Sequence, residues 1–75
     1  MKLAKLLNEM TMPQLETVRL LSNLSAEENE IFDLLAKGES IIYIADKLNI
    51  SPGTVSNRIK VIKAKILKVV NMVDI

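Results

Sequence analysis

Three polar side chains, those of Ser56, Asn57 and Lys60, recur at helical spacing in a segment without acidic residues. When Val55 and Ile62 face a core, these three project outward together from the N-terminal half of one helix. A carboxamide can pair bidentately with adenine, an ammonium can reach guanine acceptors, and a hydroxyl can donate or accept. The spacing therefore predicts hydrogen bonding to the edges of nucleic-acid bases.

Charge is distributed unevenly along a chain whose formal net charge is only +1. Six cations and no acid lie in residues 47–73, whereas residues 9–46 carry eight acids and two cations. Such a basic segment is typical of a surface that meets phosphates, although an ordinary solvated face has the same composition. The predicted phosphate contacts are Thr54, beside the free amide groups of a helix N-terminus, and Lys47, Arg58, Lys63 and Lys65.

Composition excludes several other classes of protein. The 75 residues, 49% of them hydrophobic, suffice for one small domain. The sequence has no cysteine, no histidine, no glycine-rich phosphate loop and no evident pair of catalytic carboxylates, so we predict no enzyme, no metal site and no cofactor. Lysines interrupt each apolar stretch before the roughly 18 residues of a membrane span, so we expect a cytoplasmic protein without a membrane partner.

Apolar residues recur at intervals of three and four, which predicts an all-α fold of four or five helices. The first amphipathic segment carries Leu3, Leu6, Leu7 and Met10, and Pro13 then marks a break. The next helix is expected to bury Leu15, Val18 and Leu21, with Leu20 beside them.

Helix starts are indicated by capping residues, and helix ends by residues that tolerate left-handed backbone angles. The predicted starts are two capping boxes, Thr11 with Gln14 and Ser25 with Glu28, and the caps Ser40 and Ser51-Pro52. The predicted ends are Gly38 and Asn49. The resulting helices cover about 13–22, 26–37, 41–48 and 52–73.

The last two helices are separated by a four-residue link, residues 49–52, and the second of them is basic. This order is the arrangement of a helix-turn-helix unit. Small Ala45 would let the second helix cross the first closely, and Ile50 would fill the space between them. We therefore predict a helix-turn-helix core with a long C-terminal helix.

Residues 24–66 resemble the LuxR-type (GerE/FixJ-like) helix-turn-helix domains of bacterial transcription regulators. Several short matches in a fixed register carry the resemblance, among them Leu34-Leu35-Ala36-Lys37-Gly38 and Ile50-Ser51-Pro52-Gly53-Thr54-Val55. The same stretch is similar to region 4 of sigma factors. Both relatives bind promoter DNA, so the resemblance implies a recognition helix near 52–66 in the major groove of double-stranded DNA.

Two features depart from the family pattern. Four large apolar residues stand in a row at Ile41, Ile42, Tyr43 and Ile44. Some of them must be covered by the N-terminal helices or serve as a surface for a dimer mate or RNA polymerase. Instead of a glycine and a separate fourth helix, the chain continues an apolar seam, which predicts a homodimer interface of Ile66, Val69, Val70 and Val73. The alternative is packing of this seam on the N-terminal helices.

Residues 1–23 are expected to form amphipathic helices that pack on the core or on a partner, and residues 24–75 the DNA-binding part of a single domain. No sensing domain of the kind that relatives carry fits into the first 23 residues, so we expect either a small stand-alone transcription regulator or a fragment of a longer protein. Met1 followed by an amphipathic helix favours the first. The alternative function is a protein-interaction module that binds RNA polymerase or another regulator.

Overall fold

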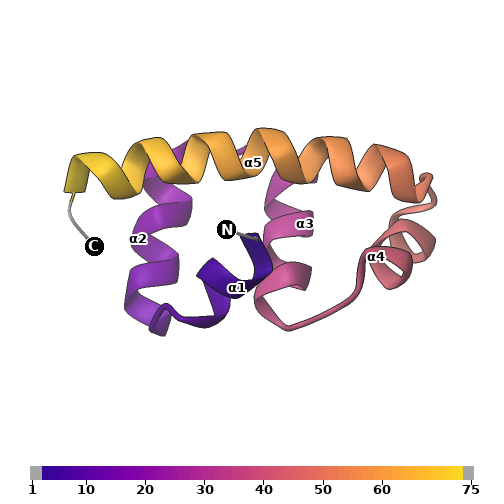
Figure 1. Ribbon diagram of the computed structural model, residues 1–75, viewed down its shortest axis with the longest axis horizontal. Coiled ribbons are helices and arrows are strands. Elements are labelled where there is room, and N and C mark those ends of the chain that lie inside the picture. The colour runs from indigo at the N-terminus through magenta and orange to yellow at the C-terminus, as the bar shows by residue number, and fades with distance from the viewer. Residues whose placement is uncertain (1–2, 74–75) are drawn as a thin grey trace.

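All regular elements in the computed structural model, which describes residues 3–73 and their side chains as far as residue 71, are α-helices. The helices are α1 (Leu3–Asn8), α2 (Met12–Ser22), α3 (Ala26–Ala36), α4 (Ile41–Leu48) and α5 (Pro52–Val73). Figure 1 shows α5 extending along the whole molecule, with α2, α3 and α4 following one another beneath it. The predicted all-α fold and the unbroken C-terminal helix are confirmed. Over residues 3–73, no helix has the length and apolar character needed to cross a bilayer.

The predicted capping boxes fix the N-termini of α2 and α3. Thr11 Oγ1 accepts the N–H of Gln14 at 3.3 Å, and Gln14 Oε1 accepts the N–H of Thr11 at 2.9 Å. Ser25 and Glu28 repeat the pattern at 3.3 and 2.9 Å. Each box satisfies two amide groups that the first turn of a helix leaves free. Pro13 lies in the first turn of α2, where a missing N–H is tolerated, so α2 includes Met12 and begins one residue earlier than expected.

The end of α3 is held by a left-handed glycine, as predicted. Gly38 has φ +88°, and its N–H donates to the carbonyl of Leu35 at 2.9 Å. The N–H of Glu39 donates to the carbonyl of Leu34 at 3.0 Å. These two bonds satisfy carbonyls of the last turn and redirect the chain toward α4.

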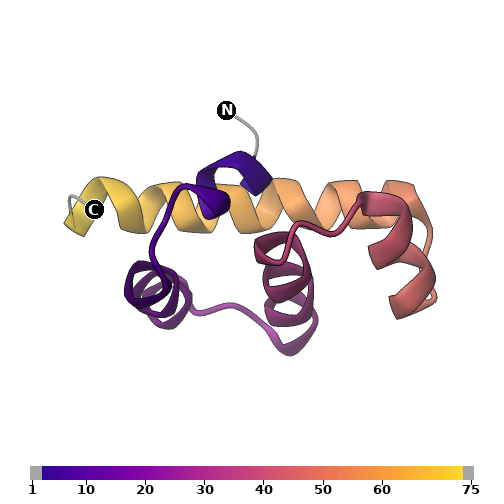
Figure 2. The same ribbon diagram turned by 90° about the horizontal axis from the view of Figure 1, so that it is seen from below.

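The core lies beneath α5 and receives apolar side chains from all five helices. Its most completely buried large members are Leu7, Val18, Ile31, Phe32, Ile44, Val55, Ile62 and Ile66. Figure 2 shows α2 and α3 nearly end-on below α5, so both helices cross it rather than run alongside it. The N-terminal helices thus contribute to the same core as the helix-turn-helix unit, because α1 packs on α3 and α2 packs on α5.

The rotation of α2 differs from the expectation. Val18 is buried and Leu15 half-buried, but Leu20 is 77% exposed and Leu21 54% exposed. Ser22, which is buried, takes the inward position instead. The apolar residues of α2 are spaced so that more than one side of the helix could face the core. Packing against α5 decides which side faces inward, and it leaves Leu20 and Leu21 outside.

The apolar row at the start of α4 is divided between core and surface. Ile44 is fully buried, whereas Ile42 is 67% exposed, Tyr43 46% and Ile41 38%. Within the described residues, the N-terminal helices therefore leave Ile42 and Tyr43 exposed. Of the two explanations left open by the sequence, a surface for a partner stays the prediction for these two residues.

Candidate nucleic-acid interface

Local hydrogen bonds hold the turn between α4 and α5. Asn49 is left-handed, with φ 58°, and ends α4 as predicted. The N–H of Ile50 donates to the carbonyl of Ala45 at 3.0 Å. Ser51 Oγ then accepts the N–H of Thr54 at 3.1 Å, which starts α5. Because the turn satisfies its own polar groups, it sets the direction of α5 relative to α4 without help from distant residues.

The two helices of this unit meet at small or branched side chains. Ala45 is 4% exposed, and Ile44 and Val55 are fully buried in the same core. Ile50 is half-buried and packs against the same core. This packing agrees with the close crossing at Ala45 and the filling role of Ile50 that the sequence predicted.

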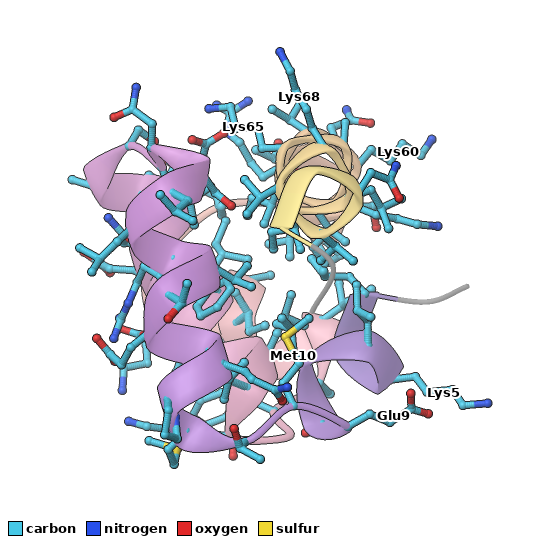
Figure 3. All side chains as sticks on the ribbon, turned by 90° about the vertical axis from the view of Figure 1, so that its left-hand side faces the viewer. Lys5, Glu9, Met10, Lys60, Lys65 and Lys68 are labelled. Atoms are coloured by element: carbon cyan, nitrogen blue, oxygen red, sulfur yellow. The ribbon has the colours of Figure 1, made fainter. Side chains whose placement is uncertain are left out.

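The predicted base-reading residues share one strip of the N-terminal half of α5. Asn57 and Lys60 are exposed and Ser56 is half-buried. Figure 3 shows that Lys60 projects from α5 on the side of α1, while Lys65 projects on the opposite side, above α2. The strip can therefore meet a ligand that approaches α5 from outside the domain.

Two of the predicted phosphate contacts are already paired with acids of α3. Arg58 Nε donates to Glu27 Oε1 at 2.5 Å, and Lys65 Nζ donates to Glu28 Oε1 at 2.7 Å. Both cations lie on the side of α5 that faces α3, which we call the α3 flank. The positive charge of this flank is partly neutralised within the chain.

Glu28 is the most constrained acid of the interface. Its side chain is 8% exposed, accepts from Lys65, and closes the capping box with the N–H of Ser25. The hydrogen bond from Lys65, followed by that from the Ser25 amide, holds the pKa of Glu28 below its usual value. Glu28 therefore links the start of α3 to the middle of α5 in its charged form.

The opposite side of α5, the α1 flank, carries Ser56, Lys60 and Lys63. Neither lysine has an ion-pair partner among the residues described. Lys47, on α4, likewise has no acidic partner there, and its Nζ lies 5.9 Å from the centre of the Tyr43 ring. The lysines of the helix-turn-helix unit that have no acidic partner among the described residues are thus different from the two cations that pair with the acidic first turn of α3.

The first turn of α5 is less open to a phosphate than expected. Thr54 gives its N–H to Ser51 Oγ, and its Oγ1 lies 2.9 Å from the same atom. The N–H of Val55 donates to the Ser51 carbonyl at 3.1 Å. These amides are used by the helix cap and are not free to bind an anion.

The predicted dimer seam faces inward. Ile66 is fully buried and Val69 is 7% exposed within a single copy of the chain, and Val70 is half-buried. The side chain of Val73 lies outside the described residues. Figure 1 shows α2 beneath the C-terminal half of α5, so the seam packs on an N-terminal helix, the alternative that the sequence left open.

Sequence reasoning missed the residues that Arg58 and Lys65 pair with, and one apolar side chain on the outer face of α5. Glu27 and Glu28 occupy the acidic first turn of α3, which was a usable signal, but their partners are 31 and 37 positions away. Val61 is 47% exposed and lies one helical turn beyond Asn57. Its spacing from Asn57 could have indicated that it belongs to the same face.

The fold and the site together define a helix-turn-helix protein. A family model described as bacterial regulatory proteins of the luxR family matches residues 22–75. This match spans more than half of the chain, and the chain therefore belongs to the LuxR family of bacterial regulatory proteins. At the family level it is a DNA-binding transcription regulator, and domains of this type are not enzymes. Comparisons with curated proteins and with solved structures gave no match.

Proposed function

We propose that this chain recognises a specific sequence in double-stranded DNA by inserting the N-terminal half of α5 into the major groove, and thereby regulates transcription. The observation that carries the proposal is the strip of half-buried Ser56 and exposed Asn57 and Lys60 on a helix whose start is held by the α4–α5 turn. A rigidly held helix is what groove reading requires, because base contacts depend on a fixed register.

Each side chain of the strip has a base-edge partner that fits its chemistry. The Asn57 carboxamide pairs with adenine, the Lys60 ammonium with guanine acceptors, and the Ser56 hydroxyl with either a donor or an acceptor. Val61, exposed beside Asn57, adds an apolar surface suited to a thymine methyl group. The side chains together favour a mixed-sequence site.

We assign the phosphate contacts to the cations that have no acidic partner among the described residues. Lys63 and Lys47 have no acidic partner among the described residues, so they can neutralise phosphates without first breaking an ion pair. Arg58 and Lys65 must compete with Glu27 and Glu28 for the same role. We therefore assign the main backbone contacts to Lys47 and Lys63.

Selection of bound duplexes from a random pool, followed by fluorescence anisotropy, tests the proposal. The selected duplex should bind at least about a thousandfold more tightly than a scrambled duplex of the same composition. Raising the salt concentration should weaken binding to both duplexes. Failure to enrich any sequence, with equal affinity for selected and scrambled duplexes, would contradict sequence-specific recognition.

Homodimerisation stays a prediction, although two residues of the predicted seam, Ile66 and Val69, are buried within one chain. Because Ile66 and Val69 serve the core of one chain, we place the dimer contact on exposed apolar residues of α2, Leu20 and Leu21. Sedimentation equilibrium distinguishes the 8.4 kDa chain from its dimer. A dimer that Leu20→Ser dissociates supports the α2 surface, and a monomer at all concentrations contradicts dimerisation in the absence of DNA.

A second candidate function is binding of a protein of the transcription machinery. The exposed Ile42 and Tyr43 favour it, because adjacent large apolar side chains rarely remain in solvent without a role. The test is binding of purified RNA polymerase by wild type and by Ile42→Ser. Binding that this substitution removes, while DNA affinity is retained, supports the second function.

A further inference from the structure

A hollow of about 480 Å³ lies on the α1 flank of α5. It is lined by Leu3 of α1, Leu35 of α3, Ile41 of α4 and Ile59 of α5, and by Lys60 and Lys63. We propose that this hollow, the α1 groove, binds a small amphipathic carboxylate, and that such a ligand competes with DNA. The volume falls in the range of roughly 300 to 1,000 Å³ typical of small-molecule sites.

The apolar body of a ligand has a rigid place to bind. Leu3 and Leu35 are each 3% exposed, because both side chains are packed in the core. They form the floor of the groove. Ile59 is half-buried, and Ile41 is 38% exposed at the rim. Covering the exposed carbon atoms of Ile41 and Ile59 removes apolar surface from water, and the packed floor of Leu3 and Leu35 lies beneath them.

The charge of the groove selects an anionic head group. Lys60 and Lys63 line it without an acidic partner among the described residues, whereas Arg58 and Lys65 on the α3 flank are paired. Among the described residues that line the groove, Glu39 is the only acid against Lys60 and Lys63, so these residues together carry a net positive charge. A carboxylate can accept hydrogen bonds from both ammonium groups and form ion pairs with them. An uncharged alcohol of the same length forms no ion pair.

Competition with DNA follows from shared residues. Ser56 and Lys60 line the groove and also belong to the proposed base-reading strip. A carboxylate held by Lys60 removes that ammonium from the bases and brings negative charge to the surface that meets phosphates. The two ligands therefore oppose each other reciprocally, and this half of the proposal rests on the proposed DNA-binding function.

Binding is tested first without DNA, by titrating the labelled protein with octanoate and with octan-1-ol and following its backbone amide resonances. Octanoate should shift the resonances of Ile41, Ile59 and Lys63 with a dissociation constant of roughly a millimolar, and octan-1-ol should bind about fivefold more weakly. Lys63→Gln should weaken octanoate about threefold and leave octan-1-ol unchanged. The matched control Lys68→Gln, on the same helix but outside the groove lining, should change neither affinity.

Equal affinity for octanoate and octan-1-ol, resonance shifts centred on another helix, or the absence of shifts would overturn the site.

Competition is then measured by anisotropy with a DNA duplex. At ten times its own dissociation constant, octanoate should raise the apparent dissociation constant for DNA about tenfold, whereas sodium acetate at the same concentration should not. An equal effect of acetate would show a salt effect and contradict competition. If the protein binds no DNA at all, the proposed function fails while the titration still decides the site.

Discussion

Arg58 and Lys60 are two cations near the start of α5 with different surroundings. Arg58 donates to Glu27, 2.5 Å away, and Lys60 has no acidic partner among the described residues. A phosphate that approaches Arg58 must displace Glu27 and tolerate its negative charge nearby. The basic character of a residue is thus not enough to assign it a phosphate contact, because the residue across from it decides whether its charge is available.

The substitution Glu27→Gln should increase DNA affinity, by up to about fivefold at low salt, because it releases Arg58 and removes one negative charge from the interface. Fluorescence anisotropy measures the change. Glu16→Gln is the matched control, since Glu16 is also ion-paired with an arginine but lies on α2. An unchanged or lower affinity of Glu27→Gln would show that Arg58 does not face the DNA.

Glu28 makes the stability of the protein depend on pH in the acidic range. Its pKa is lower in the folded chain because Lys65 and the Ser25 amide donate to its charged form. The stabilisation is therefore complete above the unfolded pKa of about 4.3, and is lost as the pH falls through the folded pKa. Urea unfolding is measured between pH 6 and 3, in steps of about one unit. The free energy of unfolding should fall more steeply with decreasing pH for wild type than for Glu28→Gln.

The exposed Glu30, on the same helix, supplies the control for that measurement. Glu30→Gln should retain the steep loss of stability of the wild type. Identical pH profiles for wild type and Glu28→Gln would contradict a stabilising role for the charged Glu28 side chain.

At the scale of elements, the α4–α5 turn is the feature on which recognition depends. Asn49 occupies the left-handed region, and the bonds of Ile50 and Ser51 complete the turn on either side of the backbone reversal. The bonds are local, so the turn can form as soon as α4 ends. The direction of α5 then follows from the turn and from the packing of α5 on α4.

Asn49→Ala should lower the free energy of unfolding by about 1 to 2 kcal/mol, because alanine pays the steric penalty of a left-handed conformation more fully than asparagine does. Asn49→Gly should be nearly neutral, since glycine adopts these angles freely. Urea unfolding followed by circular dichroism compares the two. Equal stability of the alanine and glycine variants would contradict the left-handed assignment.

The whole molecule is organised around α5, whose N-terminal half carries the proposed reading strip and whose C-terminal half closes the core with α2. This division explains why a seam with heptad-like spacing does not require a second chain. Ile66 and Val69 are covered by the protein's own N-terminal helix. The residues before the family-matched segment thus complete the fold of the DNA-binding part.

Ile66→Ala should destabilise the chain by about 2 to 5 kcal/mol through loss of buried surface and the cavity that remains. The unfolding midpoint should not depend on protein concentration, because the contact lies within one chain. Val61→Ala, at an exposed position of the same helix, should change stability little. A midpoint that rises with concentration in wild type but not in Ile66→Ala would indicate a dimer seam instead.

Local chemistry made the helices predictable from the sequence, since capping boxes at Thr11 and Ser25 and the left-handed Gly38 place helix ends within about one residue. The strip of Ser56, Asn57 and Lys60 followed from the helical period. The inward side of α2 and the pairing of Arg58 with Glu27 could not be predicted from the sequence, because both depend on how distant elements pack. Periodicity describes one helix and contains no information about its neighbour.

The measurement that tests the central claim most directly is the affinity of Asn57→Ala and Lys60→Ala for a selected duplex, with Asn71→Ala and Lys68→Ala as matched controls farther along the same helix. Each of the first two substitutions should cost about 1 to 3 kcal/mol of binding free energy and reduce the preference for the selected sequence. Asn71→Ala should change nothing, and Lys68→Ala should weaken selected and scrambled duplexes equally, if at all. Full retention of affinity and preference by Asn57→Ala and Lys60→Ala would contradict groove reading by the start of α5.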